Sequence, residues 1–323
     1  MVTADDIAAV DVQPGMLTAG VQYAERSLHF TFNRMGLADP YKRVGNIIAG
    51  IVMEEAFRHL LDTHGVKYDL LGRTHFTQKD RYDAGIAGNR YDVKGFVVKD
   101  RERLEAIRAS GPAWFLDCSA LVPADQVEAR SLRPEDLYVF PFATSPPENI
   151  GAIGRIEHWL HCFWDYDWFK NKEWKSLGRM RVQSRMPIPV HVRVGGQNEE
   201  ENFISEDLEL LPNRRGSTSA EFHTALFLHC AEVPVGDLVV SCENRAFQAT
   251  IPQTSWSNVW PNLDRVYFTG LIPKGEFKEK STEIPRFYKK CKQYGETKTT
   301  NRMLLVKHLH PVERVLTLRG SKA

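Results

Sequence analysis

The most constraining feature of the sequence is a change of hydrophobic period between Gly45 and Val98. From Gly45 to Gly65 apolar residues recur three and four positions apart, which predicts a helix with Asn46 as N-cap and Gly65 as C-cap. Residues 79–88 and 89–98 then flank an Ala-Gly-Asn turn, a pattern typical of a β-hairpin. A helix directly followed by a hairpin favours an α/β layer in which the helix packs on the sheet.

The rest of the chain divides at a polar, proline-rich segment, residues 145–151. Before it we expect a short strand at 66–72, a helix at 101–110 and inner strands at 113–122 and 136–143. After it we expect strands at 186–196, 235–244, 245–252 and 265–273, and a helix at 154–163. The predicted division is a lead-in over 1–40, an α/β domain over 41–148 and a β-rich recognition or docking domain over 149–323.

Composition excludes several classes of protein. The chain has 42% hydrophobic and 26% charged residues, which excludes a wholly disordered protein. It contains no run of about 18 apolar residues, so we expect no membrane contact. The N-terminus lacks a basic, then apolar, signal segment, and the five cysteines form no CxxC pair; both features favour a cytoplasmic location. There is no P-loop, GxSxG or HExxH motif.

The hairpin carries a group of charged residues suited to chemistry on phosphates. Asp83 lies in the first strand and Asp92 in the second, and Lys94 shares a strand face with Asp92. Two carboxylates on adjacent strands can bind one hard cation, and a neighbouring ammonium can position water. The preceding helix carries Glu54 and Glu55, and its packing would bring one of them to the same point. The competing interpretation is a solvent-exposed hairpin with charged faces.

These residues resemble the PD-(D/E)xK, or restriction-endonuclease-like, nuclease superfamily over about residues 41–144. Asp83 matches the first acid, Asp92-Val93-Lys94 matches the (D/E)xK element, and Glu54 matches the helix glutamate, with Glu55 as the alternative. The sequence departs from the pattern at Tyr82, where the motif has proline. The resemblance implies an α/β fold with a restriction-endonuclease-like mixed sheet flanked by helices, and a second, β-rich domain beyond it.

The resemblance also implies the chemistry. Mg²⁺ or Mn²⁺ held by Glu54, Asp83, Asp92 and the Val93 carbonyl would activate a water molecule for in-line attack on a phosphodiester. Lys94 would orient that nucleophile or stabilise the developing charge. The expected activity is a metal-dependent DNA endonuclease of restriction or defence against foreign DNA, acting as a homodimer or with partner proteins of a defence system. The alternative is a non-catalytic nucleic-acid-binding or assembly subunit that retains the fold.

Two features of the second half of the chain bear on ligand binding. His158, His161 and Cys162 have a spacing that a zinc site could use, but aromatic core packing is the favoured interpretation. Residues 1–150 carry 17 basic and 21 acidic side chains, whereas residues 151–323 carry 25 and 20. We therefore expect the DNA-binding surface mainly in the second half. The predicted DNA-contacting residues are Lys170, Lys172, Lys175, Arg179, Arg181 and Arg185.

Overall fold

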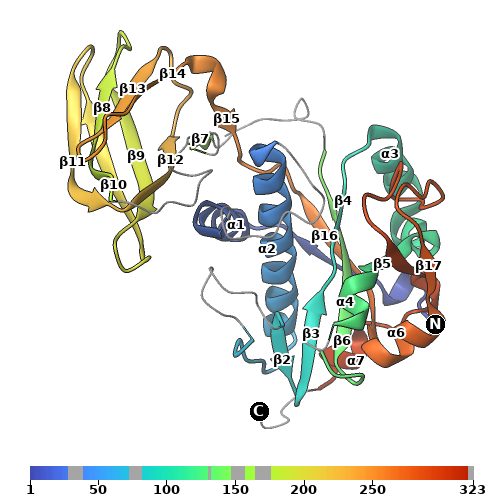
Figure 1. Cartoon of the computed structure of the whole chain (residues 1–323). Coiled ribbons are helices and arrows are strands. Elements are labelled where there is room, and N and C mark those ends of the chain that lie inside the picture. The colour runs from blue at the N-terminus through green and yellow to red at the C-terminus, as the bar shows by residue number, and fades with distance from the viewer. Residues whose placement is uncertain (28–38, 73–81, 130–131, 147–156, 164–175, 319–323) are drawn as a thin grey trace.

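A six-stranded mixed sheet forms the centre of the computed structural model, which describes residues 1–27, 39–72, 82–129, 132–146, 157–163 and 176–318 (Figure 1). Its order is β1–β16–β6–β3–β2, with β4 also paired to β6. β3 and β4 run parallel to β6, and the other pairs are antiparallel. The strands are β1 (Ala8–Asp11), β2 (Ala84–Ile86), β3 (Asn89–Val93), β4 (Phe96–Val98), β6 (Leu137–Thr144) and β16 (Arg265–Pro273).

Helices α1 (Pro14–Ser27) and α2 (Pro40–Thr63) lie on one face of this sheet. Buried residues recur at helical spacing along α2, and this face packs on the sheet. Ile48, Val52 and Ala56 belong to it. The expected helix is confirmed but begins earlier than Asn46, because Asp39 caps the chain by accepting a hydrogen bond from the Tyr41 N–H at 2.9 Å.

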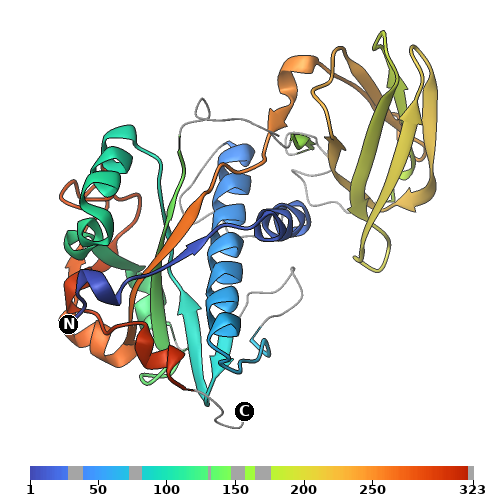
Figure 2. The same cartoon turned by 180° about the vertical axis from the view of Figure 1, so that it is seen from behind.

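The opposite face is covered by short helices and a three-stranded sheet, as Figure 2 shows from behind. Phe115, Tyr138, Phe140, Phe142 and Phe277 lie in the core between these layers. The covering elements are α3 (Arg101–Ser110), η2 (Gly111–Asp117), α4 (Ala124–Glu128), α6 (Lys274–Lys280), β5 (Ser119–Pro123), β17 (Thr282–Ile284) and β18 (Asn301–Leu305). Three shorter elements complete this part of the chain: η1 (Ala4–Asp6), η4 (Val306–His308) and α7 (Glu313–Leu316).

The described residues between 159 and 258 form two further sheets that pack face to face beside α1 (Figure 1). One has the order β10–β9–β12–β7–β15 and the other β11–β8–β13–β14. The strands are β7 (Trp159–Cys162), β8 (Gly178–Ser184), β9 (Val190–Gln197), β10 (Phe203–Leu210), β11 (Arg215–Phe222), β12 (Thr224–Cys230), β13 (Leu238–Cys242), β14 (Gln248–Ile251) and β15 (Ser257–Asn258), with η3 (Gln253–Ser255) before β15. We call this unit the sandwich.

The sheets do not follow the expected boundary at residue 148. β16 comes after the sandwich in sequence but lies between β1 and β6 in the central sheet. Strand β1 also shows that residues 1–40 are not a separate lead-in. The chain therefore leaves the α/β unit after β6, forms the sandwich and returns, an arrangement that local sequence patterns do not reveal because strand pairing here spans more than 100 residues.

Several local expectations are also corrected. Within the predicted helix at 154–163, residues 159–162 form strand β7, and residues 154–156 lie outside the described part. The predicted strand at 66–72 is reduced to a single bridge between Asp69 and Gly85. The first half of the predicted strand at 113–122 is the 3-10 helix η2. None of the described helices is long and apolar enough to cross a membrane.

Candidate active site

Helix α2 lies close to the sheet at Gly95, in the two-residue gap between β3 and β4. A Cβ atom built at Gly95 would lie 2.3 Å from the Met53 Sδ atom, so a larger residue there would displace the end of the Met53 side chain. Glu54 follows Met53, and Lys94 precedes Gly95. The contact therefore brings the glutamate-bearing turn of α2 next to the end of β3.

The gap between β3 and β4 has a cause in the neighbouring strand. The register pairs Val93 with Val139 and Phe96 with Phe142, which places Pro141 opposite Gly95. Proline has no N–H to donate, so the ladder is interrupted there. The interruption leaves Lys94 outside regular pairing, although its N–H still donates to the Val139 carbonyl at 2.8 Å.

Asp83 is tied to β3 at the point where β2 begins. Its N–H donates to the Tyr91 carbonyl at 2.9 Å, and its Oδ2 accepts a 2.6 Å hydrogen bond from the Val93 N–H. The Asp83 carboxylate thus accepts a hydrogen bond from β3 that a backbone carbonyl of a longer β2 strand would otherwise accept. At the end of β3, the Lys94 Nζ donates to Asp92 Oδ1 at 2.7 Å, with both side chains mostly buried.

The electrostatics link all four residues of the predicted set. Desolvation by burial raises the pKa of Asp83 well above its ordinary value, and the negative charges of Glu54 and Asp92 raise it further. Lys94 and the Val93 N–H partly oppose these effects. Three carboxylates and one ammonium therefore act on one another at this edge of the sheet, and the protein tolerates an unfavourable accumulation of negative charge there.

Arg58 is a member of this cluster that sequence reasoning missed. Its guanidinium lies 2.5 Å from Glu55 Oε1 and 3.7 Å from Glu54 Oε2, and its side chain is only 6% exposed. Burial alone would lower the pKa of Arg58, but Glu55, Glu54 and Asp83 together raise it. The spacing of three and four residues along α2 was the available signal. Glu55 is thus bound closely to Arg58, whereas Glu54 exerts the stronger effect on Asp83.

The donor set suits a hard divalent cation, because carboxylate and carbonyl oxygens are the ligands that Mg²⁺ and Mn²⁺ prefer. Burial is the main cause of the raised pKa of Asp83, and the repulsion from Glu54 and Asp92 that adds to it is one that a bound cation would relieve. Within the described residues, however, no three His, Cys, Asp or Glu side chains are grouped as metal ligands. A cation held by all three carboxylates would therefore require side-chain rotation.

His158, directly before β7, and His161, within β7, contact side chains of neighbouring elements. The His158 Nε2 contacts Glu25 Oε1 of α1 at 2.6 Å, and its ring stacks on His229 at 3.7 Å. His161 instead packs edge-on against Phe163. These residues join the sandwich to α1 and to the core, in agreement with the packing interpretation.

Three of the predicted DNA-contacting residues lie on β8 and on the loop that follows it. Arg179, Arg181 and Arg185 are all exposed, and we call them the β8 arginines. Arg181 lies 3.5 Å from Glu243, so acidic neighbours partly neutralise this face. Lys170, Lys172 and Lys175 lie outside the described residues.

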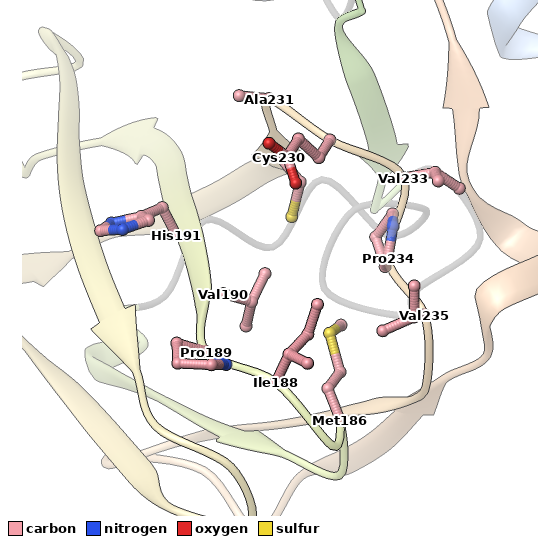
Figure 3. A pocket seen from close by; sticks show the side chains of 11 residues that line it. Met186, Ile188, Pro189, Val190, His191, Cys230, Ala231, Val233, Pro234 and Val235 are labelled. Atoms are coloured by element: carbon pink, nitrogen blue, oxygen red, sulfur yellow. The ribbon is translucent and has the colours of Figure 1, made fainter.

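A small pocket of about 130 Å³ lies at one end of the sandwich, and none of Glu54, Asp83, Asp92 or Lys94 lines it (Figure 3). Aliphatic side chains line most of the pocket. Cys230 contributes a thiol and Glu232 a carboxylate. Burial raises the pKa of that thiol to about 12, so it stays protonated and unreactive at neutral pH. The pocket contributes nothing to the chemistry of the cluster around Asp83.

Comparison of the chain with models of protein families, with curated proteins and with solved structures gave no match. The assignment of function therefore depends on the residues and geometry of the chain itself.

Proposed function

We propose that the protein is a metal-dependent endonuclease that hydrolyses DNA phosphodiester bonds. The observation that carries the proposal is that four charged residues act on one another where the sheet is interrupted after β3. They are Glu54 of α2, Asp83 directly before β2, Asp92 of β3 and Lys94 directly after β3. The order helix, antiparallel hairpin, helix and parallel strand supports a restriction-endonuclease-like architecture for this unit.

The chain's own residues have distinct roles in this proposal. Glu54, Asp83, Asp92 and the Val93 carbonyl would hold Mg²⁺ or Mn²⁺. The bound ion would lower the pKa of a water molecule and neutralise charge on the scissile phosphate. Lys94 orients the attacking water and stabilises the charge that develops at phosphorus. Its pairing with Asp92 at 2.7 Å fixes the ammonium next to the ligand set before substrate binds.

Arg58 supports the site as a positioning residue. Its guanidinium holds the Glu55 carboxylate and reaches Glu54, so it limits the rotation of the acidic turn of α2. By analogy with free-standing nucleases of the restriction-endonuclease-like superfamily, the biological role we propose is restriction of, or defence against, foreign DNA.

The test is incubation of the protein with supercoiled plasmid in Mg²⁺, Mn²⁺ or EDTA, beside Asp92→Ala and the control Asp5→Ala. Asp5 is an exposed carboxylate of η1, outside the cluster. We expect wild type and Asp5→Ala to cut in either metal, and Asp92→Ala and the EDTA samples to leave the plasmid intact. Plasmid binding without cleavage by the wild type would instead support the non-catalytic subunit.

A further inference from the structure

Phe287 combines three properties that are unusual for an aromatic residue. Its side chain is 51% exposed, its backbone has φ of +65°, and the Arg286 guanidinium lies 4.5 Å from its ring centre. A bulky side chain in the left-handed region is strained, and such strain persists only when the surrounding structure imposes it. An exposed ring held at this cost contributes little to the core, so its presence calls for a contact outside the chain.

The loop that carries Phe287, residues 285–300 between β17 and β18, is held by specific hydrogen bonds. The Phe287 N–H donates to the Thr297 carbonyl at 2.8 Å, and the Thr297 hydroxyl donates to the Pro285 carbonyl at 3.0 Å. Further along, the buried Gln293 side chain bonds both the N–H and the carbonyl of Ser119 in β5. The backbone on each side of Phe287 is thereby fixed, and the ring is presented in one direction.

This loop, which we call the basic loop, is strongly cationic. It has one acidic residue, Glu296, and five basic ones, all of them exposed. Lys298 pairs with Glu296 at 2.9 Å, and Lys292 donates to the Trp114 carbonyl at 2.7 Å. The lysines at 289 and 290 make no hydrogen bond or ion pair with a described residue. The five are Arg286, Lys289, Lys290, Lys292 and Lys298.

The basic loop is attached to the strand that leaves the candidate active site. The Tyr294 ring packs edge-on against Phe96 of β4, with the ring centres 5.4 Å apart. Phe96 is two residues after Lys94. The loop and the carboxylate cluster therefore belong to the same α/β unit.

We propose that the basic loop binds DNA, with the Phe287 ring stacking on an unstacked base and Lys289 and Lys290 contacting the flanking phosphates. An aromatic face accepts any base, and lysines beside it neutralise backbone charge, which together is the chemistry of single-strand recognition. The choice of DNA as partner rests on the proposed function. The loop thus supplies a DNA contact within the otherwise acidic α/β unit, separate from the β8 arginines.

The test is fluorescence anisotropy with a labelled single-stranded oligonucleotide and full-length protein carrying Asp92→Ala, in Ca²⁺, at several salt concentrations. Adding Phe287→Asn should weaken binding about 5- to 100-fold, the usual effect of removing one stacking aromatic. Asn tolerates positive φ, so this variant should unfold at no lower temperature than its parent. Phe287→Trp should keep the affinity. Lys289→Ala with Lys290→Ala should flatten the slope of log affinity against log salt by up to about 1.4.

Leu211→Ala is the matched control, because Leu211 is 55% exposed in the sandwich and its loss should leave binding unchanged. Unchanged affinity and salt slope in the Phe287 and lysine variants would overturn the inference. Plasmid cleavage by wild type keeps the two proposals distinguishable. If wild type cuts while the loop variants bind as their parent does, only the loop assignment fails. If wild type never cuts but the loop variants lose binding, the nuclease proposal fails and the loop assignment stands.

Discussion

Replacing Asp83 by Asn should stabilise the metal-free protein, by an amount that grows with pH. Burial, Glu54 and Asp92 hold the pKa of Asp83 above its ordinary value of 3.8. Because the folded state binds this proton more tightly than the unfolded state, the stabilising effect of the proton is present at low pH. It is lost as pH rises from about 4 to the raised pKa. Over that window wild type loses about 1.4 kcal/mol per pH unit relative to Asp83→Asn.

The same site predicts a difference between two substitutions of Asp83. The Asn side chain retains an oxygen that can accept the 2.6 Å hydrogen bond from the Val93 N–H, whereas Ala removes the acceptor. A typical intramolecular hydrogen bond contributes about 0.5–1.5 kcal/mol. Asp83→Ala should therefore be less stable than Asp83→Asn by about that amount, and both variants should lose cleavage because each lacks a metal ligand.

The measurement is urea unfolding in EDTA at a series of pH values between about 2 and 8. Asp136→Asn is a control of opposite sign. Burial alone would raise the pKa of Asp136, but hydrogen bonds from Arg133 and Arg90 lower it below its ordinary value. That variant should be less stable than wild type at neutral pH, with the difference shrinking as pH falls below 3.8. If Asp83→Asn were no more stable than wild type at pH 7, then burial and the neighbouring carboxylates would not oppose the charge on Asp83.

Three further predictions concern the roles of individual residues. Lys94→Ala should abolish or greatly slow plasmid cleavage, but Mn²⁺ binding measured by calorimetry should survive because an ammonium is not a metal ligand. If Lys94→Ala loses as much Mn²⁺ affinity as Asp92→Ala does, Lys94 has another role. Glu54→Gln should lower the cleavage rate more than Glu55→Gln, because Arg58 already engages Glu55; the reverse ranking would assign the site to the other face of α2. Changing all three β8 arginines to Ala should flatten the salt dependence of duplex binding by up to about 2.7. An unchanged slope would make them a solvated face.

The sequence determined the local elements because their patterns depend on neighbouring residues. The apolar spacing of α2, the Ala-Gly turn between β2 and β3, and the continuous apolar run of β6 each reflect burial of one face or both faces of a single element. The candidate residues Glu54, Asp83, Asp92 and Lys94 could be selected for the same reason, since their helix and hairpin are consecutive in the chain.

Tertiary structure decided what depends on distant segments. Only the pairing of β16 with β6 shows that the chain returns to the central sheet after the sandwich, across more than 100 residues. Likewise, the contact between Met53 and Gly95 joins α2 to the end of β3, and no local pattern encodes it. The charge on Asp83 was visible in the sequence, but its raised pKa arises from burial and from Glu54 on a packed helix, 29 positions earlier. Sequence patterns record which faces are buried, whereas the energy of a site depends on what those faces are buried against.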